Sequence, residues 1–143
     1  MQTIESFIPS FDLHGKTALV TGSAQGLGWA IAAAFAGLGA HVILNGRTEA
    51  PLLQAQQRLQ AAGYSASIWC QDISDLPTLE AAYAELPVQP DILVNTVGSR
   101  LRRPFSELSV TQITQHIQDN LTATVVLSKL AAMSMAAKGY GRI

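Results

Sequence analysis

Residues Thr17 to Gly28 read TALVTGSAQGLG, a short apolar and β-branched run followed directly by glycines at positions 22, 26 and 28. Glycine between the end of a strand and the start of a helix lets the chain turn tightly and lets backbone N–H groups approach a ligand. A helix that begins at such a turn also presents a positive N-terminus to an anion. The stretch therefore predicts a strand, a glycine-rich turn and a helix that together hold the pyrophosphate of a nucleotide.

The segments that follow this turn alternate between helix and strand. A first helix is predicted by apolar residues at helical spacing, namely Leu27, Ile31, Ala34, Phe35 and Leu38. Gly37 and Gly39 are expected to end it. Further strands are predicted at 41–45, 67–71 and 91–95, and further helices at 49–62, 77–86 and 110–138. Such alternation implies parallel strands covered by helices on both faces. The predicted fold class is α/β, a doubly wound parallel sheet of Rossmann type in strand order 3-2-1-4, with strand 5 only beginning at Gly141–Ile143.

Size and composition favour one domain that associates with further protein. A length of 143 residues suits a single domain. Charged residues make up 13% of the chain, against about 25% in ordinary soluble domains. So few charges indicate that the chain hides more surface than one monomer covers, and an oligomer or a missing remainder would account for this. The net charge of −1 gives no sign of a nucleic-acid partner.

Cysteine and histidine give no sign of a metal site. The single cysteine, Cys70, excludes an intrachain disulfide and a cysteine metal cluster, and its place in the apolar run SIWC predicts a buried thiol. The three histidines, His14, His41 and His116, are too scattered to form a helical ligand pair. We therefore expect no bound metal.

Two features bear on where the chain acts. No run reaches about 18 consecutive apolar residues. The segment Met1–Ser10 has no basic stretch followed by an apolar one, as a signal peptide would. Both features predict a cytoplasmic chain without membrane contact.

The last predicted helix, 110–138, carries little charge. From Ala123 to Ala137 it reads ATVVLSKLAAMSMAA, in which only Lys129 is charged and apolar residues occupy every side. A helix that is apolar all round is buried all round. Since one face can pack on the sheet, the other predicts a homo-oligomer formed through this helix.

Four segments together resemble the short-chain dehydrogenase/reductase family. They are GKTALVTGSAQGLG at 15–28, Asp72-Ile73, Asn95-Thr-Val-Gly98 and Asp119-Asn120-Leu121. Their order and spacing match the family from Gly15 to Ile143, nearly the whole chain. Within the family, the stretch that ends in Arg102-Arg103-Pro104-Phe105 is similar to gluconate 5-dehydrogenase-like members and related sugar-acid or ketone reductases.

The resemblance implies a set of cofactor contacts. It implies that Gly22, Gly26 and Gly28 hold the pyrophosphate, with Ser23 and Leu27 in contact with it. It also implies that Asp72 bonds the adenine amino group and that Ile73 lies beside the ring; a solvated loop acid or a cap for the following segment is the alternative for Asp72. Asn95 and Gly98 match the family's Asn-Asn-Ala-Gly segment beside the cofactor ribose, from which Thr96 and Val97 depart.

The end of the second strand favours NADP(H) over NAD(H). Sheets selective for NAD end this strand with an acid that accepts hydrogen bonds from the ribose 2′-hydroxyl and repels a 2′-phosphate. Here the strand ends Asn45-Gly46-Arg47-Thr48, with no carboxylate before Glu49. Arg47 offers a planar fork to a phosphate, and Thr48 offers a hydroxyl. The alternative is a solvated Arg47 with Thr48 as helix N-cap, and both can hold together.

Two further site assignments come from the resemblance. Asparagine is a poor residue in the middle of a helix, and Asn120 falls there. The resemblance assigns Asn120 to the family's catalytic tetrad, where the asparagine orders a water in a proton relay; a tolerated polar residue on an exposed face is the alternative. Arg102 and Arg103 could clamp an anionic sugar acid over the nicotinamide, or form a solvated loop pair.

The resemblance also implies residues that this sequence lacks. The family uses a serine after strand five and a Tyr-x-x-x-Lys on the next helix, whose tyrosine moves a proton while hydride is transferred. None of Tyr64, Tyr83 and Tyr140 has a lysine four residues on. We therefore expect residues 1–143 to be an NAD(P)-binding Rossmann domain that is truncated, incomplete at its C-terminal end.

Three functions remain open. The expected one is the N-terminal part of an NAD(P)(H)-dependent oxidoreductase that interconverts a secondary alcohol, such as that of the sugar acid gluconate, and a ketone, and that is inactive alone. The alternatives are a non-catalytic NADP(H)-binding module and a structural subunit completed by another chain. The first is preferred because nothing in the sequence has adapted to the shorter form.

Overall fold

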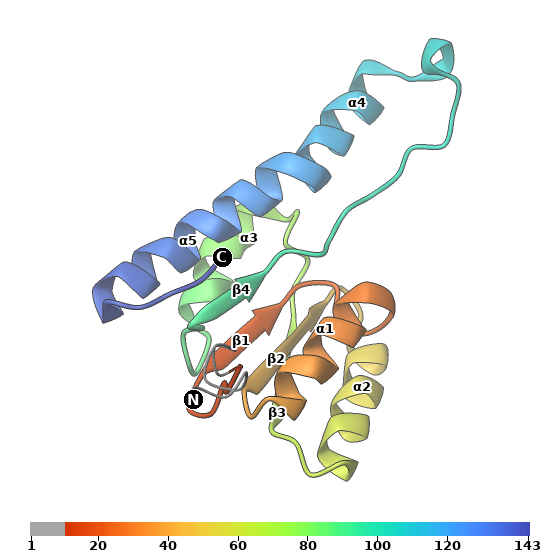
Figure 1. Ribbon diagram of the computed structural model, residues 1–143. Coiled ribbons are helices and arrows are strands. Elements are labelled where there is room, and N and C mark those ends of the chain that lie inside the picture. Colours follow the sequence, from red (N-terminus) through yellow and green to blue (C-terminus); the bar gives the residue numbers. More distant parts are fainter. Residues whose placement is uncertain (1–10) are drawn as a thin grey trace, which may run out of the picture.

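Within residues 11–143, which the computed structural model describes, the chain forms a parallel sheet of four strands in the order β3-β2-β1-β4 (Figure 1). The strands are β1 (Thr17–Val20), β2 (His41–Gly46), β3 (Ala66–Cys70) and β4 (Ile92–Val94). The helices are α1 (Gly26–Gly37), α2 (Glu49–Ala61), α3 (Leu76–Ala84), the short η2 (Phe105–Glu107), α4 (Val110–Ile117), the π-helical turn η3 (Gln118–Thr122) and α5 (Ala123–Lys138). The predicted fold and strand order are confirmed, while the prediction made for Met1–Ser10 lies outside the described residues.

A fifth strand begins at the outer edge of β4. Arg142 forms a parallel bridge with Ile92. Its N–H donates to the Asp91 carbonyl at 3.0 Å, and its own carbonyl accepts from Leu93 N–H at 2.9 Å. Lys138, the last residue of α5, forms an ion pair with the Asp91 carboxylate at 3.2 Å, which holds the end of the helix beside this edge. The predicted start of strand 5 is therefore present.

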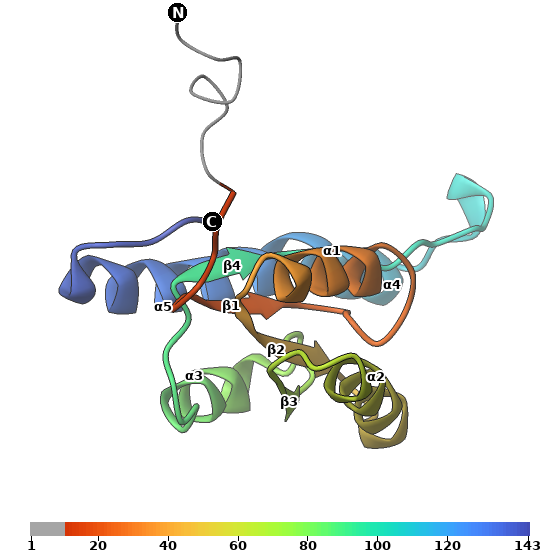
Figure 2. The same cartoon turned by 60° about the horizontal axis from the view of Figure 1, so that its bottom comes forward.

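Helices cover both faces of the sheet. Figure 2 shows α1 and α2 on one side and α3 and α5 on the other. Alternate strand residues point into two separate cores, as the pleat requires. The first core joins Ala18, Val20, Val42 and Leu44 to α1 and α2, and the second joins Leu19, Ile43 and Leu93 to α3 and α5. The sheet is thus buried on both faces, which explains its near-continuous apolar strands.

The buried face of α1 is formed by small residues. Leu27, whose spacing helped to predict the helix, is 70% exposed, whereas Ala32 and Ala36 are 0% and 3% exposed. Together with Gly28, these residues form a stripe of small side chains at i, i+4 and i+8. Small side chains let the helix axis approach the sheet closely, and hydropathy alone does not reveal this preference.

The predicted burial of Cys70 is wrong. The residue is exposed and its thiol is free. Cys70 is the last residue of β3, which is the edge strand of the sheet. The neighbouring core residue on this strand is Trp69, so the side chain of Cys70 points away from that core.

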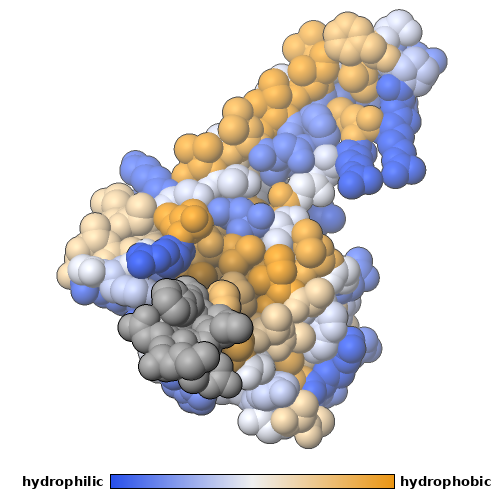
Figure 3. Space-filling model, in the orientation of Figure 1, coloured by the Kyte–Doolittle hydropathy of each residue, from blue (hydrophilic) through white to orange (hydrophobic). Residues whose placement is uncertain are grey.

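The last helix runs without a break from Val110 to Lys138 and projects beyond the sheet (Figure 1). Its inner face buries Ala123, Leu127, Ala131 and Met135. The predicted burial on all sides is therefore not reached within one chain. Large apolar side chains along its length are more than half exposed, namely Val110, Ile117, Leu121, Val125 and Met133. Figure 3 shows the resulting apolar band on the surface over this helix.

By length and composition the same helix could cross a membrane. The segment Val110–Lys138 has a window of mean hydropathy 1.2, of which 22% is buried. A helix that packs its apolar face on a sheet passes the same test, and α5 does so. The absence of membrane contact and the cytoplasmic location remain predictions from the sequence.

Candidate functional site

A hollow of about 710 Å³ opens at the carboxyl edge of the sheet, where the strands end and α1 begins. In open α/β sheets this edge is where ligands bind. Segments after all four strands contribute to its lining, which consists of Gly22, Gln25, Gly26, Leu27, Gly28, Asn45, Gly46, Arg47, Gln71, Asp72, Ile73, Ser74, Thr96, Val97, Gly98, Ser99, Arg100 and Asp119. The volume suits a small-molecule ligand of cofactor size.

The three glycines of the first turn are required for different physical reasons. Gly22 and Gly26 both have φ of +61°, a conformation that other residues rarely adopt. Gly28 has an ordinary φ, but a Cβ at this position would stand 2.4 Å from the Gly22 carbonyl oxygen. The turn and the first turn of α1 therefore pack backbone against backbone, and this leaves the N-terminus of the helix open to the hollow.

The ends of β1 and β4 are tied together beneath this turn. Thr21 Oγ1 accepts from Thr96 N–H at 2.9 Å and from Val97 N–H at 3.3 Å. Thr96 Oγ1 in turn donates to the Thr21 carbonyl. Val97 fills the space beside Gly22, where a Cβ would come within 3.2 Å of Val97 Cγ2. The two departures from the family segment thus form a consistent packing at the floor of the hollow.

One end of the hollow lies beyond β2 and β3, and its charged groups are Arg47 and Asp72. Asp72 Oδ1 accepts from Ser74 N–H at 2.9 Å and from Ser74 Oγ at 2.7 Å, so the carboxylate caps its own turn. Among the described residues Asp72 Oδ2 accepts no hydrogen bond, which leaves it able to accept from a ligand. Both interpretations of Asp72 are therefore compatible with the geometry. Ile73 is only 2% exposed and belongs to the core under α3, so its contact with the hollow is slight.

Buried polar residues hold the glycine turn against β2. Ser23 is fully buried, and its Oγ accepts from Asn45 N–H at 3.0 Å. Asn45 Nδ2 donates to the carbonyls of Trp69 and Gln71, each at 3.0 Å. Ser23 does not line the hollow, because its hydroxyl is directed at β2. Asn45 does line it, and its Oδ1 has no hydrogen-bond partner within the described residues.

The other end of the hollow lies beyond β4 and is formed by Gly98, Ser99 and Arg100, with Asp119 from the π turn. Asn120 supports this wall from behind: its Oδ1 accepts from Ser99 N–H at 3.0 Å. A π turn inserts one extra residue into a helix and frequently marks a functional site. Asn120 therefore lies in the helix irregularity beside the hollow, although its side chain is not part of the lining.

The predicted site residues separate into two groups. The structure brings Gly22, Gly26, Leu27, Gly28, Arg47, Asp72, Ile73 and Gly98 together around the hollow. The remaining ones lie outside its lining: Ser23, Thr48, Asn95, Asn120, Arg102 and Arg103.

The residues outside the lining have identifiable structural positions. Thr48 is the N-cap residue of α2, but its side chain makes no capping hydrogen bond. Asn95 Nδ2 donates to Ser128 Oγ at 3.1 Å, which directs the amide toward α5. Arg102 and Arg103 are exposed on the loop that runs beside α4 away from the sheet (Figure 1).

Further lining residues were not predicted from the sequence, namely Gln25, Asn45, Gly46, Gln71, Ser74, Thr96, Val97, Ser99, Arg100 and Asp119. Most of them are immediate chain neighbours of residues that were predicted. Arg100 is the one whose position indicates a role most directly, since it follows Gly98 by two residues, just after the predicted strand 91–95.

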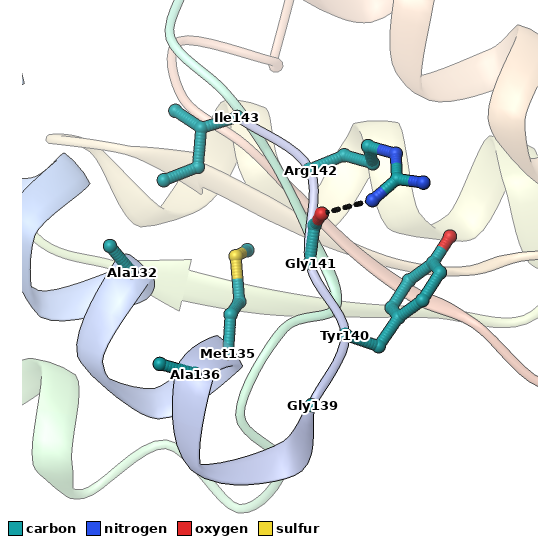
Figure 4. A pocket seen from close by; sticks show the side chains of 8 residues that line it. All are labelled: Ala132, Met135, Ala136, Gly139, Tyr140, Gly141, Arg142 and Ile143. Atoms are coloured by element: carbon teal, nitrogen blue, oxygen red, sulfur yellow. Dashed lines mark hydrogen bonds between the residues drawn. The ribbon is translucent and has the colours of Figure 1, made fainter.

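A second hollow of about 470 Å³ lies between the end of α5 and the beginning of strand 5 (Figure 4). Figure 4 shows Ala132, Met135 and Ala136 facing the final residues of the chain. Arg142 Nη1 donates to the Gly141 carbonyl at 2.7 Å. None of the predicted site residues reaches this hollow, and its lining contains no acid, histidine or hydroxyl other than Tyr140. Residues 11–143 also contain no group of three or more His, Cys, Asp or Glu that could hold a metal ion.

Known proteins match most of this chain in sequence and in fold. A model of the short chain dehydrogenase family matches residues 16–143. Gluconate 5-dehydrogenase of Gluconobacter oxydans is 35% identical over 136 residues, which are 93% of this chain and 53% of that protein.

Two solved structures are similar in both sequence and fold. A 3-oxoacyl (acyl-carrier-protein) reductase of Agrobacterium tumefaciens with NADP bound has a TM-score of 0.85 at 35% identity, over 97% of this chain and 54% of that one. A gluconate 5-dehydrogenase of Burkholderia cenocepacia, in complex with NADP and tartrate, has a TM-score of 0.85 at 29% identity, over 92% of this chain and 53% of that one. The chain thus spans about half the length of the relatives that it matches.

Proposed function

The chain belongs to the short chain dehydrogenase family of oxidoreductases, and from this premise we propose that residues 1–143 are an NADP(H)-binding domain of an enzyme that interconverts a secondary alcohol and a ketone. The observation that carries the proposal is the glycine turn at the carboxyl edge of the sheet, with Arg47 at one end of the hollow it opens into. A sugar acid of the gluconate type is the proposed substrate class, because relatives in two organisms carry that activity.

The residues around the hollow fit a phosphorylated dinucleotide. The turn at Gly22 and Gly26 depends on positive φ angles, and a Cβ at Gly28 would fill the backbone cradle. Such a cradle at a helix N-terminus presents N–H groups and positive potential to a pyrophosphate. Arg47 lies beyond β2, where the adenosine 2′-phosphate of NADP is expected. Asp72 Oδ2 is free to accept from the adenine amino group.

When bound, the nicotinamide supplies or accepts hydride, which the side chains of a protein do not do. The contribution of this chain is to bind and orient. The backbone of the glycine turn would hold the pyrophosphate, and Arg47 would hold the adenosine end. Gly98 and Ser99, in the wall beyond β4, would face the nicotinamide end. Asn120 is proposed to hold this wall and to take part in moving protons through an ordered water, while Arg102 and Arg103 stay candidates for binding an anionic substrate.

Direct titration tests the proposal. Isothermal calorimetry of the folded chain with NADPH and with NADH is expected to show binding of both, with NADPH preferred by about tenfold or more because of charge-assisted contacts to the 2′-phosphate. ATP serves as the control for non-specific phosphate binding. Absence of heat with both coenzymes, from material whose circular dichroism shows a folded protein, would contradict the proposal.

We further propose that the exposed apolar band of α4 and α5 is covered by a second copy of the chain. Sedimentation velocity is expected to give a dimer or larger species, and Val125→Glu to weaken association by about tenfold or more, because a buried carboxylate loses its hydration. Gln57→Glu, at an exposed position of α2, is the control and should leave association unchanged. A monomer for the unchanged chain, or a chain that requires detergent to remain dispersed, would contradict the proposal.

A further inference from the structure

Three polar side chains form a cluster behind the β4 wall of the hollow. Asn120 Oδ1 accepts from Ser99 N–H at 3.0 Å, and Asn120 Nδ2 donates to Ser99 Oγ at 3.1 Å. His116 Nδ1 lies 3.0 Å from Ser99 Oγ and 3.0 Å from Asn120 Nδ2. Asn120 Nδ2 also donates to the His116 carbonyl at 2.9 Å. His116, on α4, thus lies within hydrogen-bond distance of both other members of the cluster.

His116 Nδ1 lies within hydrogen-bond distance of both other members of the cluster. The Asn120 Nδ2 amide has two hydrogen atoms and three acceptors within 3.1 Å, namely Ser99 Oγ, His116 Nδ1 and the His116 carbonyl. The Ser99 hydroxyl accepts from Asn120 Nδ2 and can donate to the same His116 nitrogen. The acceptor at the Nδ1 position therefore organises both partners.

The cluster joins the irregular helix to the wall of the hollow. Gly98, Ser99 and Arg100 line the hollow, and a Cβ at Gly98 would stand only 3.0 Å from Asn120 Oδ1. On its other side the same π turn is tied to the Asp72–Ser74 turn, since Gln118 Nε2 donates to the Ser74 carbonyl at 2.9 Å. The direct contacts of His116 itself are with Ser99 and Asn120, on the β4 side of the hollow, and not with the glycine turn or with the Asp72–Ser74 turn.

We propose that His116 is a positioning residue that, through Ser99 and Asn120, sets the wall against which the nicotinamide half of the dinucleotide binds. The inference rests on the proposed function. The sheet order is β3-β2-β1-β4, so the glycine turn after β1 lies between Arg47 after β2 and Ser99 after β4. With the pyrophosphate at the turn and the 2′-phosphate at Arg47, the nicotinamide half falls on the Ser99 side.

Two substitutions of His116 distinguish the effect of losing the hydrogen-bond acceptor from the effect of destabilising the helix. His116→Leu removes the acceptor and keeps a good helix former, whereas His116→Asn keeps an oxygen acceptor near the Nδ1 position but is the poorer helix former. Calorimetry measures the affinity of each variant for NADPH and for 2′,5′-ADP, which is the adenosine half alone. His116→Leu is expected to lower the affinity for NADPH by about fivefold to tenfold, which is the effect of one or two hydrogen bonds. The affinity for 2′,5′-ADP is expected to fall by less than about twofold. His116→Asn is expected to restore most of the NADPH affinity.

The chain offers a matched control in His41. Its Nδ1 lies 2.7 Å from Ser65 Oγ and its Nε2 lies 2.9 Å from Ser67 Oγ, so it too is a histidine between serine hydroxyls. Burial lowers the pKa of His41, which favours its neutral form. It lies at the opposite end of β2 from the hollow, and His41→Leu should leave both affinities unchanged.

The outcomes distinguish the two proposals. If the unchanged chain binds neither ligand, the proposed function fails. If it binds both and His116→Leu binds NADPH equally well, the role of His116 is overturned while the proposed function stands. Equal losses for NADPH and 2′,5′-ADP, or a larger loss for His116→Asn than for His116→Leu, would also overturn it, because either result reports damage to the helix.

Discussion

Replacing Gly28 by alanine is expected to lower the affinity for NADPH by about tenfold or more and to destabilise the fold by about 1–3 kcal/mol. The new Cβ would stand 2.4 Å from the Gly22 carbonyl oxygen and 2.8 Å from Thr96 Oγ1. Neither neighbour can move easily, because Gly22 lies in the turn itself and Thr96 Oγ1 donates to the Thr21 carbonyl. Relief of the clash must therefore displace the turn whose N–H groups are proposed to hold the pyrophosphate.

The same helix provides the control for Gly28→Ala. At Gly37, the last residue of α1, the nearest atom to an added Cβ is the Tyr64 hydroxyl at 3.9 Å. Gly37→Ala is therefore expected to stabilise the fold by about 0.5–1 kcal/mol and to leave NADPH affinity unchanged. Urea unfolding gives the stabilities and calorimetry the affinities. Changes of the same sign in both variants, or normal binding by Gly28→Ala, would show that the close packing at Gly28 is not what forms the site.

The sequence predicts the elements and the sheet order because both depend on local patterns. Each predicted strand lies within two residues of the observed one, since a run such as His41–Asn45 is short, apolar and bounded by glycine. The turn at Gly22 is equally local, because its positive φ requires glycine whatever surrounds it. The strand order then follows from chain connectivity.

Side-chain direction is less predictable, because it depends on contacts that are distant in the sequence. The inner face of α1 is set by how closely Ala32 and Ala36 let the helix approach the sheet. Cys70 is exposed at the end of β3, which is an edge strand of the sheet. The apolar residues beside Cys70 in the sequence do not show that this strand lies at the edge. Asn95 turns toward Ser128, thirty-three residues later, rather than toward the hollow.

The π turn also could not be predicted from the sequence. Asparagine is a poor helix former, so the sequence marks position 120 as unusual, but it does not show that the helix there is a π turn. The Asn120 side chain is held by hydrogen-bond partners that the local sequence does not reveal: Ser99, on a loop twenty-one residues earlier, and His116, one turn earlier on the helix. A resemblance to a family identifies Asn120, but His116 becomes visible as its partner only through the three-dimensional contacts.

Replacing Arg47 by alanine is expected to lower the affinity for NADPH by about tenfold to a hundredfold, while the affinity for NADH changes by less than about twofold. A hydrogen bond between a guanidinium and a phosphate contributes about 1.5–3 kcal/mol, which corresponds to this range. Arg47 lines the hollow just after β2. Its guanidinium has no ion-pair partner among residues 11–143, where the ion pairs join Asp12 with His14 and Asp91 with Lys138. Its charge is therefore available to a ligand.

The two arginines of the distal loop are the matched control for this prediction. Arg102→Ala/Arg103→Ala removes two positive charges, one more than Arg47→Ala, from exposed positions outside the hollow. If long-range attraction of an anionic ligand determined affinity, the double variant would weaken NADPH at least as much as Arg47→Ala, and raised salt would erase both effects. If a direct contact with the 2′-phosphate determines the affinity, only Arg47→Ala lowers the affinity for NADPH, and the affinity for 2′,5′-ADP falls by the same factor. An equal loss for NADPH and NADH in Arg47→Ala would instead assign Arg47 to the adenosine or pyrophosphate and remove the physical reason for preferring NADP(H).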